Sequence, residues 1–121
     1  MKKTFVLGLF CLLLVSCVTT TPASKPLYSW NNYQEEMYSY AKEENGENLK
    51  KLMKTYQNII DKQTGSRKVI PPGICADYGY LLYKQGKKEE GLSFLNKEMV
   101  LYPESSVFVS RIIKNLENEI N

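Results

Sequence analysis

The stretch PGICADYGYLLYKQGKKEEGLSFLNKEMVLYP, residues 72–103, decides the fold of this chain. Apolar residues recur every three or four positions on both sides of a short glycine-lysine turn, which predicts two helices at 72–85 and 88–101. Pro72 suits the first position of the first helix, because an N–H group there has no partner within the helix and proline lacks that group. Pro103 ends the second helix. Two helices joined by so short a turn form an antiparallel hairpin.

Two glycines, Gly79 and Gly91, stand inside these expected helices. A glycine in a helix interior is about 1 kcal/mol less favourable than an alanine, so we expect a packing reason for each. Because glycine has no Cβ atom, we expect the two helices to approach each other closely at these positions.

The stretch resembles one repeat of the tetratricopeptide family, whose repeats are about 34 residues long. With Pro72 as the first position, the family's small residues, turn glycine and late proline are matched by Gly79, Gly91, Gly86 and Pro103. Glu98 departs from the pattern, because the family has a small residue there. The resemblance implies stacking against neighbouring hairpins, since a single repeat cannot bury its own faces.

The expected neighbours are an upstream hairpin and a last helix. Helical patterns over 31–44 and 48–63, separated by Asn45-Gly46, predict the hairpin, and a pattern over 104–119 predicts the last helix. When the repeat that starts at Pro72 is advanced by 34 residues, apolar residues of this last helix fall at the packing positions of a next repeat. The last helix therefore resembles the capping helix of such a repeat protein. The upstream hairpin does not match the repeat. We therefore expect an all-α fold of about five helices in tetratricopeptide-like antiparallel hairpins, with an ordinary helical bundle as the alternative.

The N-terminus has the order of a secretory signal peptide. Lys2 and Lys3 precede an apolar run at 5–15, which fits the signal core of about 7–15 residues and is too short for the roughly 20 residues that span a bilayer. A buried core helix is the alternative. The run ends in Leu14-Val15-Ser16-Cys17, which resembles the bacterial lipobox. That resemblance implies that Cys17 is acylated and that the mature protein begins there.

The expected organisation follows from this anchor. Residues 1–16 are the lipoprotein signal peptide, 17–27 are the lipidated cysteine with a flexible, proline-containing tether, and 28–121 are the helical domain. Val18 follows the cysteine. The inner-membrane retention signal of enteric bacteria has an aspartate at this position, and this chain has none there. We therefore expect attachment through Cys17 to the periplasmic face of the outer membrane, and two or three acyl chains make such attachment stable.

The composition excludes several function classes. The chain has no histidine, which excludes Ser-His-Asp and Cys-His catalysis and histidine-ligated zinc. Its net charge of +3 includes Lys2 and Lys3, so the mature chain is nearly neutral and gives no electrostatic case for nucleic acid. Three acidic pairs are candidate acid/base pairs, but each lies in a helical pattern beside polar or basic residues, which favours solvated faces: Glu35-Glu36, Glu43-Glu44 and Glu89-Glu90. We expect a protein that is not an enzyme, with no catalytic residue, cofactor or metal.

The cysteine count leaves one thiol in the domain. Cys11 leaves with the signal peptide and Cys17 is the lipid site, so Cys75 has no partner for an intramolecular disulfide. We expect Cys75 to be a small buried apolar residue, with a reactive or intermolecular thiol as the alternative.

A resemblance to one family covers nearly the whole mature domain. YSWNNYQEEMYSY at 28–40 and PPGICADYGYLLYKQGKKEEGLSFLNKEMVLYPESSVFVSRII at 71–113 resemble a family of small bacterial lipoproteins with a domain of unknown function. Members are often encoded beside a lipoprotein that resembles the curli secretion channel. The resemblance implies an envelope assembly, with an envelope protein as partner and that channel-like lipoprotein as a candidate.

The sequence therefore predicts a membrane-tethered protein-interaction module. Carrying the repeat family's partner-binding positions over gives Tyr80, Tyr83 and Lys84, which we expect on one partly exposed face. If both tyrosines are core residues, the exposed side of the last helix around Lys114 and Glu117 is the alternative face. A small-ligand or glycan-binding lipoprotein, with tyrosines and the tryptophan stacking on sugars, stays open, as does an accessory activator of a cell-wall synthase. An apolar pocket bordered by the tryptophan would favour the glycan.

Overall fold

The computed structural model describes residues 22–119, and its secondary structure is helical. The elements are α2 (Tyr33–Lys42), α3 (Gly46–Asp61), α4 (Ile74–Lys84), α5 (Lys88–Leu101), the 3₁₀ turn η1 (Pro103–Ser105) and α6 (Ser106–Asn118). No strand forms within residues 22–119, so the predicted all-α fold of about five helices is confirmed. The signal peptide, Cys17 and the first part of the tether lie outside the described residues.

Four helices, α2, α3, α4 and α6, start two positions away from the predicted residue, and the residues before α3 and α4 explain two of these shifts. The Asn45 side chain accepts a hydrogen bond of 2.8 Å from the backbone N–H of Asn48, so Asn45-Gly46 begins α3 and does not end α2. Helix α4 starts at Ile74, two positions later than predicted, because Gly73 adopts φ 90°, which is left-handed backbone. Pro72 therefore lies in the turn before the helix.

Helices α4 and α5 approach each other closely at two glycines. A Cβ atom built on Gly79 would lie 2.6 Å from the carbonyl oxygen of Gly91, and one built on Gly91 would lie 2.6 Å from the carbonyl oxygen of Gly79. The predicted close approach at these two glycines is confirmed. Gly86, in the turn between the helices, has φ 87°, a conformation that L side chains rarely adopt.

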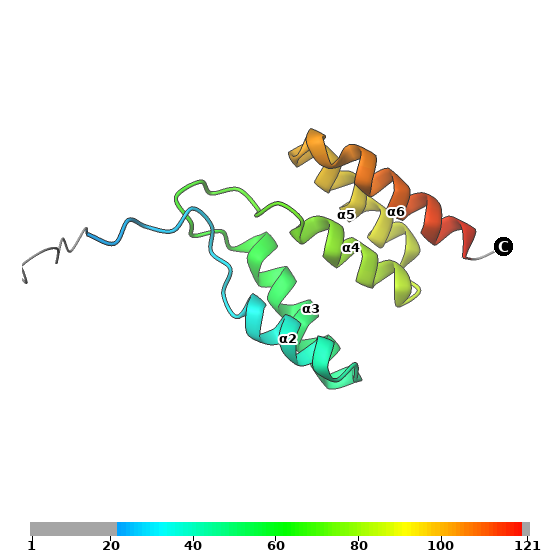
Figure 1. Cartoon of the computed structure of the whole chain (residues 1–121), viewed down its shortest axis with the longest axis horizontal. Coiled ribbons are helices and arrows are strands. Elements are labelled where there is room, and N and C mark those ends of the chain that lie inside the picture. The colour runs from blue at the N-terminus through cyan, green and yellow to red at the C-terminus, as the bar shows by residue number, and fades with distance from the viewer. Residues whose placement is uncertain (1–21, 120–121) are drawn as a thin grey trace, which may run out of the picture.

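Helix α4 lies between two groups of helices, as Figure 1 shows, and contributes to a core on each side. The first core, shared with α3 and covered in part by α2, consists of Leu52, Tyr56, Ile59, Ile74, Tyr78 and Leu82. The second core, shared with α5 and α6, consists of Ala76, Tyr83, Leu95, Val109 and Leu116. Two sides of α4 are thus buried in the two cores, and the surface of α4 between them is what can contact another molecule.

Glu98 supports the start of α4 from within the protein. Its side chain is 2% exposed, and its Oε1 atom accepts a 2.7 Å hydrogen bond from the backbone N–H of Gly73. A carboxylate at a helix N-terminus interacts favourably with the helix dipole and with an N–H group that lacks a partner in the helix. This contact explains why glutamate replaces the small residue of the repeat pattern.

The segment before α2 is attached to the helical domain. Pro26 and Leu27 accept backbone hydrogen bonds from Ser66 and Arg67, at 2.9 and 3.1 Å. From there a row of six neighbouring aromatic rings crosses the fold, with adjacent centroids 4.8–6.1 Å apart: Tyr28, Trp30, Tyr33, Tyr56, Tyr78 and Phe94. The end of the sequence-predicted tether is therefore held by the domain.

Candidate partner-binding site

A groove separates α2 from α4. No Cα atoms of these two fully described helices lie within 8 Å of each other, and α3, which packs on both, forms the floor between them. A pocket of about 130 Å³, here called the α2–α4 pocket, opens in this groove. Its lining residues are Met37 and Tyr40 of α2, Leu52 and Tyr56 of α3, and Asp77, Tyr80 and Leu81 of α4.

Helical spacing brings these side chains to the groove. Asp77, Tyr80 and Leu81 are three and four positions apart on α4, so they share one strip of its surface. Met37 and Tyr40 have the same spacing on α2 and pack in part against the first core. The pocket is therefore assembled from three helices, each of which contributes from the edge of its buried stripe.

The polar groups of the pocket are few and close together. Tyr56 is fully buried, and its hydroxyl lies beside the Tyr33 hydroxyl and the Asp77 carboxyl without forming a hydrogen bond of good geometry to a described residue. The hydroxyl of Tyr33 donates to Oδ2 of Asp77 at 3.3 Å. Asp77 takes part in no ion pair within residues 22–119. The pocket thus combines an apolar wall with one uncompensated carboxylate and one unsatisfied hydroxyl.

Desolvation sets the protonation of both groups. It raises the pKa of the Tyr56 hydroxyl far above its usual range, and the charge of Asp77 raises that pKa further. The Tyr56 hydroxyl therefore keeps its proton. Asp77 is exposed as a residue, but the surrounding protein partly desolvates its carboxyl group. This desolvation is the largest cause of the raised pKa of Asp77, and the hydrogen bond donated by Tyr33 lowers that pKa in part.

The structure separates the three residues that the sequence placed on one face. Tyr80 is 40% exposed and lines the α2–α4 pocket. Tyr83 is 7% exposed and packs in the second core, because α6 covers that side of α4. Lys84 is exposed, and its Nζ atom pairs with Oε2 of Glu119 at 2.7 Å. The expectation of a shared exposed face is wrong for Tyr83, whose side chain is core.

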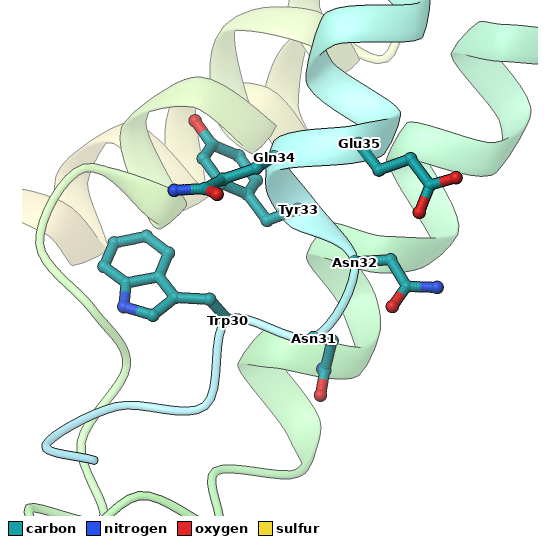
Figure 2. A pocket seen from close by; sticks show the side chains of 6 residues that line it. All are labelled: Trp30, Asn31, Asn32, Tyr33, Gln34 and Glu35. Atoms are coloured by element: carbon teal, nitrogen blue, oxygen red, sulfur yellow. The ribbon is translucent and has the colours of Figure 1, made fainter.

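A larger hollow surrounds the start of α2 and includes Trp30. It has a volume of about 550 Å³ and is lined by six consecutive residues, 30–35. Figure 2 shows that Trp30, Tyr33 and Gln34 lie on one side of the chain while Glu35 points away from them. Most of the lining side chains are polar and they do not converge, so this hollow is not the apolar tryptophan pocket that would favour a glycan.

A third hollow, of about 450 Å³, lies between α3 and the turn before α5. Its rim carries three lysines, Lys50, Lys54 and Lys87, all of them exposed. It contains no buried polar side chain without a partner. Within the described range, no three histidine, cysteine or carboxylate side chains lie close enough together to hold a metal ion. None of the helices described is long and apolar enough to cross a bilayer.

Sequence reasoning found Tyr80 and missed the other polar residues of the pocket. Tyr40 and Tyr56 belong to the apolar stripes of their helices, which predicted burial and no further role. The sequence feature that could have indicated this pocket is Asp77, a single acidic residue among the apolar residues of α4. An acidic residue in the first turn of a helix is also the ordinary complement of the helix dipole, so this signal alone does not point to a site.

Comparison with known proteins gives one match. The model of a family described as a domain of unknown function, DUF4810, matches residues 27–112. No curated protein and no solved structure matches the chain. The matched range contains every residue that lines the α2–α4 pocket.

Proposed function

The chain belongs to the DUF4810 family, a family whose domain has no known function, and from that premise we propose that it is a non-enzymatic protein–protein interaction or assembly module of the bacterial cell envelope. The anchor is an acylated Cys17 in the outer membrane, with the domain on the periplasmic side. The lipobox resemblance at the end of a short signal core supports this anchor. The partner is an envelope protein, and the channel-like lipoprotein named above is the first candidate.

The observation that carries the proposal is the α2–α4 groove with Tyr80 at its surface. A tyrosine supplies rigid apolar area with a polar tip, and such residues are frequent anchors at protein interfaces. Tyr80 also falls on a partner-binding position of the tetratricopeptide pattern. Tyr83 packs in the second core, and Lys84 forms an ion pair with Glu119. The proposed binding residues are therefore Tyr80 and the other residues of the pocket.

The test is a quantitative binding experiment with the lipidated protein. The partner is captured from detergent-solubilised envelope membranes, identified by mass spectrometry and purified. Its Kd is then measured for the wild type, for Tyr80→Ala and for Tyr38→Ala. Tyr38 is the matched control, because it is a 68% exposed tyrosine on α2 that does not line the pocket.

Tyr80→Ala is expected to raise the Kd at least about tenfold, since a well-packed interface anchor is worth about 2 kcal/mol or more. Tyr38→Ala is expected to leave the Kd unchanged. Circular dichroism must show that both variants keep their helices. An unchanged Kd for folded Tyr80→Ala would contradict the proposal that the groove is the docking site.

A further inference from the structure

Three tyrosines and one carboxylate meet at the α2–α4 pocket. Tyr40, Tyr56 and Tyr80 come from three different helices, and Asp77 lies one turn before Tyr80 on α4. The rest of the lining is apolar: Met37, Leu52 and Leu81. Aromatic rings attract cations through their quadrupole, and this attraction strengthens where water is excluded. The combination of rings and carboxylate therefore favours a positively charged group.

The charge at the pocket is uncompensated by the protein itself. Asp77 forms no ion pair within the described part of the chain, and its recorded hydrogen bond comes from the neutral hydroxyl of Tyr33. No basic residue of the described chain lines the α2–α4 pocket. A partly desolvated carboxylate without a neighbouring cation is unfavourable. A cation that enters the pocket can therefore form a favourable interaction with Asp77 that no group of the described protein provides.

The buried hydroxyl of Tyr56 adds a second polar group beside the carboxylate of Asp77. It is fully buried, lines the pocket and has no hydrogen-bond partner. An unsatisfied buried polar group is rare in folded proteins and is unfavourable by about 1–3 kcal/mol. Because solvent does not reach the Tyr56 hydroxyl, it belongs to the polar wall behind Asp77, and Asp77 is the group that a cationic ligand meets.

The size of the pocket limits what the ligand is. A volume of about 130 Å³ is well below the roughly 300 Å³ at which pockets for whole small molecules begin. It suits a single side chain that reaches in from a partner bound along the groove. An apolar wall with a polar end suits the methylene stem and charged tip of lysine or arginine.

We propose that the α2–α4 pocket binds one lysine or arginine side chain of the partner protein. The methylene stem packs against Met37, Leu52 and Leu81. The charged tip lies among the tyrosine rings, where it pairs with Asp77. This inference rests on the proposed function, because it names the chemical group that the groove recognises.

The experiment uses model compounds with the lipidated protein in detergent micelles. N-acetyl-lysine methylamide and N-acetyl-arginine methylamide are the cationic probes, and N-acetyl-norleucine methylamide is the uncharged control of similar shape. Binding is followed by the NMR shifts of the Leu52 and Leu81 methyl groups. We expect saturable shifts with the cationic probes and a norleucine affinity at least about fivefold weaker, as one cation–π or charge contact provides.

Variants connect the shifts to the assigned groups. Asp77→Asn and Tyr80→Leu are each expected to weaken binding of the lysine probe about fivefold to tenfold. Asp61→Asn is the matched control, because it removes an exposed carboxylate of α3 that does not line the pocket. It is expected to leave binding unchanged. Circular dichroism checks that each variant is folded.

The results separate this inference from the proposed function. Equal affinity for the lysine and norleucine probes, or unchanged lysine binding in folded Asp77→Asn, would overturn the assignment of a cationic side chain. Tighter binding of tetramethylammonium than of either amino-acid probe would overturn it as well, since the pocket would then serve a free quaternary amine. A partner Kd that is unchanged in folded Tyr80→Ala would instead contradict the proposed function.

Discussion

At the scale of single residues, Asp77 links binding to stability. Its raised pKa means that the folded protein holds this proton to higher pH than the unfolded chain does, whose pKa is near the ordinary value of 3.8. The free energy of unfolding therefore falls as the pH rises from about that value through the folded pKa, and the ionised carboxylate destabilises the fold at pH 7. Residues kept for binding often have such an unfavourable effect on stability.

The first prediction concerns the pH dependence of Asp77→Asn. The variant cannot ionise, so its melting temperature at pH 7 is expected to equal or exceed that of the wild type. The difference between the two is expected to shrink as the pH falls through the raised pKa of Asp77, because the wild type then also holds its proton. Thermal unfolding followed by circular dichroism across this range measures it. A melting temperature at pH 7 that falls further than that of Asp61→Asn would contradict the sign of this linkage.

The second prediction concerns Cys75, whose side chain is fully buried as the sequence led us to expect. Burial raises the pKa of the thiol to about 11, with a further rise from Glu98 and an opposing effect of Lys97. The reactive thiolate is therefore scarce at pH 8. Iodoacetamide is expected to modify Cys75 slowly in the native protein and rapidly in urea, as peptide mass mapping measures. Equal rates in both conditions would identify the accessible thiol of the alternative reading.

At the scale of the elements, the crossing of α4 and α5 is the most demanding feature of the fold. The third prediction is that Gly79→Ala lowers the free energy of unfolding by about 1–3 kcal/mol. The new methyl group would meet the backbone oxygen of Gly91 at 2.6 Å and the backbone nitrogen of Leu95 at 2.9 Å, and backbone atoms yield less easily than side chains. In a domain of this size, each 1 kcal/mol lowers the melting temperature by about 4–8 °C.

Gly46→Ala provides the matched control for this prediction. A Cβ atom on Gly46 would meet no atom within 4 Å, and this glycine also lies in a helix. The substitution is expected to leave the melting temperature unchanged or to raise it, because alanine restricts the unfolded chain. If Gly79→Ala behaves like Gly46→Ala, the two helices do not cross as closely as described.

Helix positions were predictable from the sequence to within a few residues, because each helix has an apolar stripe that the cores bury. The start of α3 was misread because Asn-Gly is typical both of a helix end and of a helix start, and only the bond from Asn48 to Asn45 distinguishes them. The role of Tyr83 was misread for a different reason. A buried and an exposed tyrosine look alike in sequence, and the position of α6, which depends on long-range packing, decides between them.

The α2–α4 pocket could be predicted only in part. Tyr80 followed from the tetratricopeptide resemblance, which aligns one hairpin. Tyr40 and Tyr56 come from the upstream hairpin, which does not match the repeat, and their distance from α4 is set by how that hairpin packs. A pocket formed by three helices depends on geometry that no single amphipathic pattern contains.

At the scale of the whole molecule, the proposed function joins a lipid anchor at Cys17 to the helical domain that carries the α2–α4 groove. The backbone bonds of Pro26 and Leu27 to residues 66–67, together with the row of aromatic rings, attach the tether firmly to the helices. Pro26 and Leu27 therefore belong to the helical domain and do not lengthen the predicted tether. Under the proposed lipid anchor, a short tether would keep the groove near the membrane, where the proposed envelope partner would be available.

The fourth prediction tests the anchor. Cys17→Ala is expected to abolish metabolic labelling with palmitate and to release the protein from the membrane fraction, because the proposed acyl chains would be attached to that residue. Cys75→Ala is the matched control and is expected to keep both the label and the membrane association. A Cys17→Ala protein that still takes up palmitate and still sediments with membranes would contradict the lipoprotein assignment.

The most direct test of the central claim is to locate the partner on the surface in living cells. Photoreactive p-benzoylphenylalanine is placed at Tyr80 in the groove, at Tyr38 on the outer side of α2, and at Lys114 on the exposed side of α6. Irradiation is expected to give a covalent adduct with an envelope protein from position 80, and little or none from positions 38 and 114. Adducts from position 114 or 38 without one from position 80 would contradict the claim that this protein holds its partner in the α2–α4 groove.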